Sequence, residues 1–178
     1  GIQFDGKNYL VPLGMHFLSA EGIPQSAVAV DQILKPLKGR SLRSSTVILD
    51  CARKNPLNST DFSANALLRI AGINRNIKTT SRTPGGVAEV TAPTNTLVAF
   101  AAQPGKFAIS ADRPGNYSIF AETLASGLGA NVPLQTALQQ VSTKVNQVSH
   151  GLQTPWVSSQ QVKPFFPTTP GKRTLASD

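Results

Sequence analysis

The sequence predicts an α/β fold of three layers, in which a mostly parallel sheet is flanked by helices. Two short runs, 46–49 and 96–101, are branched and apolar, which is typical of strands buried on both faces of such a sheet. Apolar residues recur at helical spacing over 26–38, 119–128 and 134–148, so helices alternate with these strands.

Composition favours one soluble globular domain. The chain has 178 residues, enough for a hydrophobic core, and 40% of them are hydrophobic. No apolar run approaches the roughly 18 residues of a membrane span, and no signal peptide is recognisable. We therefore expect no membrane span and a cytoplasmic or periplasmic location, and the sequence does not choose between these two.

Charge points to a basic surface rather than to a nucleic-acid site. The net charge is +8, from 17 Lys and Arg against 9 Asp and Glu. No run of more than two consecutive basic residues occurs, and aromatic residues that could stack on bases make up only 6% of the chain. Two loose basic clusters stand out: Lys35, Lys38, Arg40 and Arg43, then Arg69, Arg75, Lys78 and Arg82.

Cysteine and histidine offer no metal or disulfide framework. A single Cys excludes an internal disulfide, and no Cys/His group has zinc spacing. His16 and His150 lie far apart, and we expect each to be structural or exposed. The acidic residues are scattered singly and predict no calcium site, so no cofactor is expected.

Local signals set the boundaries of the first elements. Asp5-Gly6 predicts a turn, followed by a short strand over 8–11. The helix over 26–38 has Ser26 as a candidate N-cap and ends near Gly39, with Pro36 shortening or kinking its last turn.

The second half alternates loops and helices. Residues 57–95 form a long segment read mainly as a mobile loop, with a short helix possible over 63–70. One helix over 119–128 ends at the glycines 127 and 129, and another begins at Pro133 and closes at Gly151. A short edge strand is expected over 163–166, and residues 167–178 read as a disordered tail.

The residues that follow the first buried strand carry the strongest functional signal. They read Asp50-Cys51-Ala52-Arg53-Lys54-Asn55-Pro56 and lie where open α/β sheets bind ligands. This phrase resembles the nucleophile segment of caspase-like cysteine peptidases, in particular the bacterial metacaspase-type branch, which reads Asp-x-Cys-Arg-x-Asn-Pro. Four residues match, but Ala52 stands at the position of the nucleophilic Cys and Cys51 at the variable position.

Further phrases extend the resemblance over residues 1–166. Residues 1–12 resemble the family segment that follows the catalytic His-Gly, with Gly1 as that glycine. Residues 96–105 resemble the next core strand, 115–118 the opening of the following helix, and 153–159 the segment before the last strand. The resemblance implies a caspase–haemoglobinase-type three-layer sandwich, of which this chain holds the C-terminal part.

The resemblance also implies roles for single residues. Asp50 would shape an acidic pocket for Arg or Lys, although capping of the turn after the strand is an alternative. Asp5 would lie near that pocket or simply form its turn, Asn116 would line the groove, and Trp156 would anchor groove or core. Candidate processing points in the long loop are Arg75, Lys78 and Arg82, unless these only keep an exposed loop soluble.

The nucleophile position leaves two explanations open. Ala52 cannot attack a carbonyl carbon, and Cys51 is one residue away, where an extended chain points side chains to the opposite face. Cys51 is expected to act as a small buried hydrophobe, with a minor possibility that it is the nucleophile. Ala52 marks either a substitution that silences an active enzyme or a natural pseudo-peptidase.

The sequence therefore predicts part of an endopeptidase that cleaves after Arg or Lys and is inactive as written. The alternative is a pseudo-peptidase that binds peptides or acts as a scaffold. A third interpretation, an anion-binding domain, rests on net charge alone. The strand at 46–50 would expose an apolar edge if it were alone. We expect a missing N-terminal segment or a second chain to supply further strands and the catalytic histidine.

Overall fold

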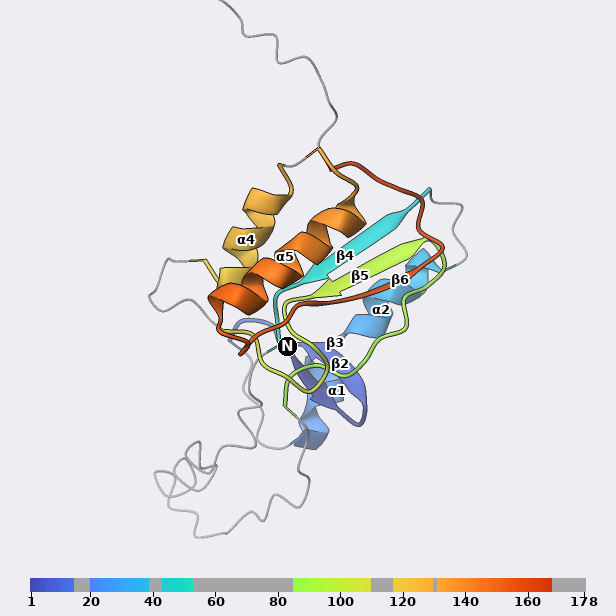
Figure 1. Cartoon of the computed structure of the whole chain (residues 1–178). Helices are drawn as coiled ribbons and strands as arrows, with labels where there is room; N and C mark the ends of the chain where they lie inside the picture. The colour runs from blue at the N-terminus through green and yellow to red at the C-terminus, as the bar shows by residue number, and fades with distance from the viewer. Residues whose placement is uncertain (15–19, 39–42, 53–84, 110–116, 130, 168–178) are drawn as a thin grey trace, which may run out of the picture.

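The computed structural model describes residues 1–14, 20–38, 43–52, 85–109, 117–129 and 131–167 (Figure 1). Within these residues no helix is long and apolar enough to cross a membrane. The predicted helix over 63–70 and the tail beyond residue 167 lie outside the described part of the chain.

The central sheet contains both predicted buried strands. Its order is β4-β5-β6, with bounds Ser45–Leu49, Thr96–Phe100 and Trp156–Gln160. β4 pairs parallel with β5, and β6 pairs antiparallel with β5. All five residues of β5 are buried, because this strand is central in the sheet and its side chains pack into hydrophobic clusters on both faces.

A smaller antiparallel sheet stands at the beginning of the chain. It has the order β1-β2-β3, with bounds Ile2–Phe4, Lys7–Leu10 and Val28–Ala29. Asp5 and Gly6 have φ angles of +48° and +68°, which fit a tight hairpin turn between β1 and β2. The predicted turn is confirmed, and the predicted strand begins one residue earlier than expected.

Helices cover both faces of the central sheet, as predicted. The helices α4 (Ile119–Gly127) and α5 (Leu134–Val148) lie on one face, and α2 (Val30–Leu34) lies on the other (Figure 1). Alternate residues of β5 enter different clusters: Leu97 and Ala99 pack with α5, whereas Val98 and Phe100 join the larger cluster. The predicted three-layer α/β sandwich is therefore confirmed.

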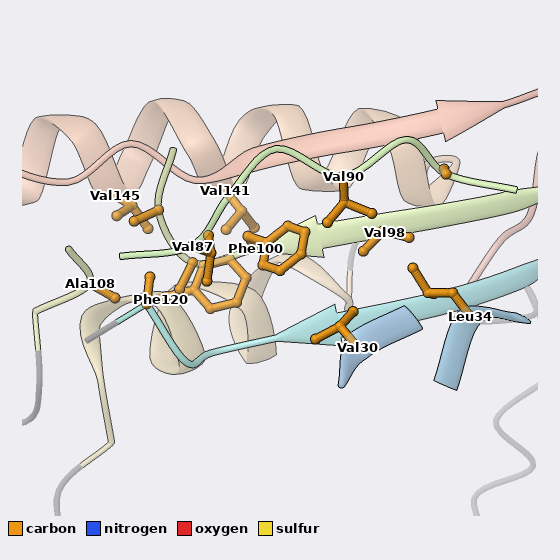
Figure 2. Packing of buried hydrophobic residues seen from close by; sticks show 14 residues of the cluster. Val30, Leu34, Val87, Val90, Val98, Phe100, Ala108, Phe120, Val141 and Val145 are labelled. Atoms are coloured by element: carbon orange, nitrogen blue, oxygen red, sulfur yellow. The ribbon is translucent and has the colours of Figure 1, made fainter. Parts of the chain in front are cut away.

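The larger cluster also draws on residues without regular secondary structure. Val87 and Val90 are almost fully buried and pack in it together with Val30, Phe100 and Phe120 (Figure 2). These two valines belong to the end of the segment predicted as a long loop. Its last part, 85–92, thus follows an irregular path but contributes to the core.

Both helices of the second half begin and end close to their predicted bounds. Ser118 caps α4, because its hydroxyl oxygen accepts the backbone N–H of Ala121 at 3.0 Å. Pro133 is the N-cap of α5, one position before its expected place. The chain leaves α5 through His150 and Gly151, both with positive φ, and His150 is exposed, which is one of the two alternatives predicted for it.

The helix predicted over 26–38 is shorter than expected. Ser26 ends a short helix, α1 (Ile23–Ser26), which follows the 3-10 turn η1 (Ala20–Gly22). Val28 and Ala29 then pair with β2, so α2 begins only at Val30. Its continuation, η2 (Lys35–Leu37), is a 3-10 turn, since Pro36 lacks the N–H that an α-helix needs.

The last strand was predicted in the wrong place. Residues 163–166 form no strand, and β6 lies at Trp156–Gln160, where it overlaps the phrase 153–159 that was expected to precede the last strand. Pro164 lacks the donor needed to continue a ladder, whereas Trp156–Gln160 pairs along the whole length of β5.

β4 is less buried than its composition predicts. Among the described residues it pairs only with β5, so it forms an edge of the central sheet. Thr46 is exposed, and Val47, Ile48 and Leu49 are only half-buried. An apolar strand with an open edge is a site where further strands can pair.

Candidate functional site

Three chain segments meet at one edge of the central sheet. Leu49 at the end of β4 pairs with Phe100 at the end of β5, and Phe100 pairs with Trp156 at the beginning of β6. Asp50, Cys51 and Ala52 leave the sheet from this edge. Since β4 and β5 are parallel, their carboxyl ends lie together, which is where open α/β sheets bind ligands.

Asp50 is attached to the beginning of α4. The hydroxyl of Ser118 donates a hydrogen bond to Oδ2 of Asp50, and the same oxygen of Ser118 caps the helix. Ser118 is 7% exposed and Asp50 is half-buried, so the bond is partly shielded from water. The carboxylate therefore lies by the N-terminus of a helix, where the helix dipole favours negative charge.

Ala52, at the position of the expected nucleophile, is enclosed. Its exposed fraction is 0%, and it belongs to the larger hydrophobic cluster. Its carbonyl oxygen accepts the backbone N–H of Ala108 at 2.6 Å, which ties the end of β4 to the loop after β5.

Cys51 lies against the first residue of the chain. A Cβ atom added to Gly1 would lie 2.8 Å from Sγ of Cys51 and 3.0 Å from its carbonyl oxygen. The thiol is half-buried and packs against the larger cluster, so the predicted hydrophobic burial is present only in part. The beginning of β1 and the end of β4 are therefore neighbours.

The loop that leaves β5 is held by Gln153, a residue for which no role was predicted. Gln153 is 1% exposed; its Nε2 donates to the carbonyl of Ala101 at 2.8 Å, and its Oε1 accepts the N–H of Ile109 at 2.7 Å. One buried amide thus fixes both ends of the loop 101–109. Its place in the sequence does not reveal these distant partners.

Trp156 and Asp5 occupy different surroundings. The ring of Trp156 is half-buried, and its centroid lies 5.9 Å from that of Phe100, so it anchors the end of the core beside the site edge. Asp5 is exposed at the hairpin tip. It stands four residues from Gly1, a span of about 13 Å along a strand.

Several predicted site residues lie outside the described part of the chain. They are Asn116, the residues of the nucleophile phrase from Arg53 to Pro56, and the candidate processing residues Arg75, Lys78 and Arg82. Within the described ranges, no three residues among His, Cys, Asp and Glu group together as metal ligands would. Asp50, Cys51, Ala52 and Trp156 are the predicted residues that the fold brings to the same sheet edge.

Comparison with known proteins identifies the family. No match was found among curated proteins. The family model described as the caspase domain matches residues 1–166, which include the central sheet, its helices and the site edge. This match covers most of the chain, and the chain therefore belongs to the caspase-domain family.

Proposed function

We propose that the chain is the C-terminal part of a metacaspase-type cysteine endopeptidase domain of bacterial type, which in its competent form cleaves after Arg or Lys. The observation that carries this proposal is Asp50, held by Ser118 at the carboxyl edge of the parallel strands. A carboxylate in this position can form charge-assisted hydrogen bonds with the guanidinium or ammonium group of a substrate. Membership of the caspase-domain family supports a peptide or protein as the substrate.

Cysteine peptidases need a thiolate, a base that takes its proton, and donors for the oxyanion. In the competent form we assign the thiolate to a Cys at position 52 and the base to a histidine immediately before Gly1. The contact between Gly1 and Cys51 supports this assignment, because a residue that precedes Gly1 would lie close to the end of β4. As written, the chain has no nucleophile at position 52.

The alternative is a pseudo-peptidase that binds peptides or acts as a scaffold. The observation in its favour is the enclosure of Ala52, whose methyl group fills a place in the hydrophobic cluster. A thiol at this place would need some of its cover to open before a substrate could reach it. Cys51, which is half-buried and next to Gly1, remains a minor candidate for the nucleophile.

The open edge of β4 supports a missing segment as the partner of this chain. We propose that a strand leading to Gly1 pairs with β4, with a second chain as the other possible source. Gly1 lies at the carboxyl end of β4, so a strand that ends there would run parallel to β4 and cover Val47, Ile48 and Leu49.

The test restores the proposed nucleophile and supplies the proposed histidine. The chain with Ala52→Cys is co-expressed with a segment that supplies strands and a histidine before Gly1, and hydrolysis of a fluorogenic peptide ending in Arg is measured. We expect turnover, and we expect it to persist when Cys51→Ser is added. Turnover that needs Cys51 would move the nucleophile by one residue. Binding of the Arg peptide without any turnover would establish the pseudo-peptidase.

A further inference from the structure

The side chain of Asn8 forms a two-point clamp on a distant backbone. Its Nδ2 donates to the carbonyl oxygen of Ala88 at 2.9 Å, and its Oδ1 accepts the N–H of the same residue at 2.6 Å. Asn8 is 6% exposed. A buried amide that satisfies both polar groups of one residue fixes its position and its orientation, and losing it would leave both groups unpaired.

Gln3 adds a third hydrogen bond to this clamp. Its Nε2 donates to the carbonyl oxygen of Gly85 at 2.9 Å, and its side chain is also 6% exposed. Gln3 and Asn8 are directly opposite in the pairing of β1 with β2. Two neighbouring amides on one face of the hairpin therefore hold the segment 85–88.

The clamped segment 85–88 is in turn bonded to the loop after β5. The N–H of Gly105 donates to the carbonyl oxygen of Val87 at 2.9 Å. Gly85 and Gly86 approach the loop so closely that a Cβ atom would clash with the ring of Phe107 at the first and the carbonyl oxygen of Lys106 at the second. Val87 itself is 1% exposed in the larger cluster.

The same loop reaches the end of β4, because the N–H of Ala108 donates to the carbonyl oxygen of Ala52. The hairpin thus meets the end of β4 along two routes. One is the direct contact of Gly1 with Cys51, and the other runs through segment 85–88 and the loop at 105–108. The two routes close a ring of contacts around the site edge.

We propose that Asn8, assisted by Gln3, is a positioning residue that sets where the beginning of β1 lies against Cys51 and Ala52. An effect of Asn8 on catalysis rests on the proposed function, since the base is assigned to the residue before Gly1. The positioning of Gly1 by Asn8 is independent of that function, because it concerns only contacts within this chain. Loss of the clamp frees the beginning of β1 while the central sheet and its helices keep their packing.

The single cysteine of the chain allows a test without any activity. Modification of Cys51 by an excess of a small thiol reagent is timed in the native chain, in Asn8→Ala and in Asn146→Ala. Asn146 is the matched control, because its amide also donates a partly buried hydrogen bond, to the hydroxyl of Thr154 at 2.7 Å, and neither of these two residues belongs to the ring of contacts. Unfolding in urea is measured for each variant.

We expect Asn8→Ala to speed the modification by about tenfold, because it removes two buried hydrogen bonds that contribute about threefold each. In Asn146→Ala the rate of Cys51 modification should stay within about twofold of the rate in the parent chain, although the loss of stability is similar. If Asn8→Ala does not fold, Gln3→Ala removes a single bond of the same clamp and should give a smaller change in the same direction. An unchanged rate, or a rate that follows global stability equally in both asparagine variants, overturns the proposal.

Discussion

Ser118 joins Asp50 to helix α4: its hydroxyl donates to the carboxylate, while its oxygen accepts the N–H of Ala121. The end of β4 and the first turn of α4 are 68 residues apart in sequence, and this one side chain links them. The acidic group proposed to recognise Arg or Lys is therefore held by two secondary-structure elements rather than by a loop alone.

Removing this link should destabilise the chain more than removing an ordinary helix serine. Ser118→Ala loses both the N-cap and the partner of Asp50, and we expect a loss of about 1–2 kcal/mol in the free energy of unfolding. The control is Ser126→Ala on the same helix, whose exposed hydroxyl donates to the carbonyl of Glu122. Urea denaturation of both variants makes the comparison, and equal losses would show that neither the N-cap nor the Asp50 link contributes to stability.

Gln153→Ala should be among the most damaging polar substitutions. It leaves the carbonyl of Ala101 and the N–H of Ile109 without their buried partner, which costs about 2–4 kcal/mol in unfolding free energy. Gln147→Ala, at an exposed position of α5, should change stability by less than about 0.5 kcal/mol. Hydrogen exchange at the amide of Ile109 should accelerate in the first variant alone, and a protected amide there would refute the assigned bond.

Two glycines with similar backbone conformations should respond differently to a methyl group. Gly86 and Gly151 have φ angles of +74° and +79°, so alanine costs about 1–2 kcal/mol at either position from the left-handed conformation. At Gly86 the new Cβ would also clash with the carbonyl oxygen of Lys106, whereas at Gly151 nothing lies within 4 Å. Thermal unfolding should therefore show a clearly larger loss for Gly86→Ala, and equal losses would mean that segment 85–88 does not pack on the loop.

The open edge of β4 predicts self-association of the chain when it is expressed alone. A charged residue on an edge strand discourages pairing with another chain, so Thr46→Lys, at the exposed position of β4, should reduce association. Light scattering over a range of concentrations, with unfolding in urea as the check on stability, measures the effect. A parent chain that stays monomeric at high concentration would count against a partner strand at this edge.

The elements that the sequence predicts well are those marked by an apolar run or by helical periodicity within the element itself. The apolar runs predicted β4 and β5, and helical periodicity predicted α4 and α5 within about a residue or two. The helix over 26–38 was predicted too long, because Val28 and Ala29 pair with β2, a partner that periodicity does not reveal. The last strand was misplaced for the same reason, since β6 is defined by its pairing with β5.

Sequence patterns predicted the site residues that lie together in one short phrase after β4. Asp50, Cys51 and Ala52 are consecutive, and their place after an apolar strand is visible in the sequence. Ser118, Gln153 and Asn8 act through partners 68, 52 and 80 residues away. Their roles depend on how the chain folds back on itself, so composition and spacing gave no sign of them.

The proposed recognition of Arg or Lys by Asp50 is measured most directly by the substrate preference of the restored chain. With Ala52→Cys and the preceding segment supplied, kcat/KM is compared for peptides that end in Arg and in Ala, with and without Asp50→Ala. We predict a preference for Arg of about 100-fold or more that falls by at least tenfold when the carboxylate of Asp50 is removed, as expected for loss of a charge-assisted bond. A preference for Arg that survives Asp50→Ala unchanged would contradict it, because another group would then recognise the basic side chain.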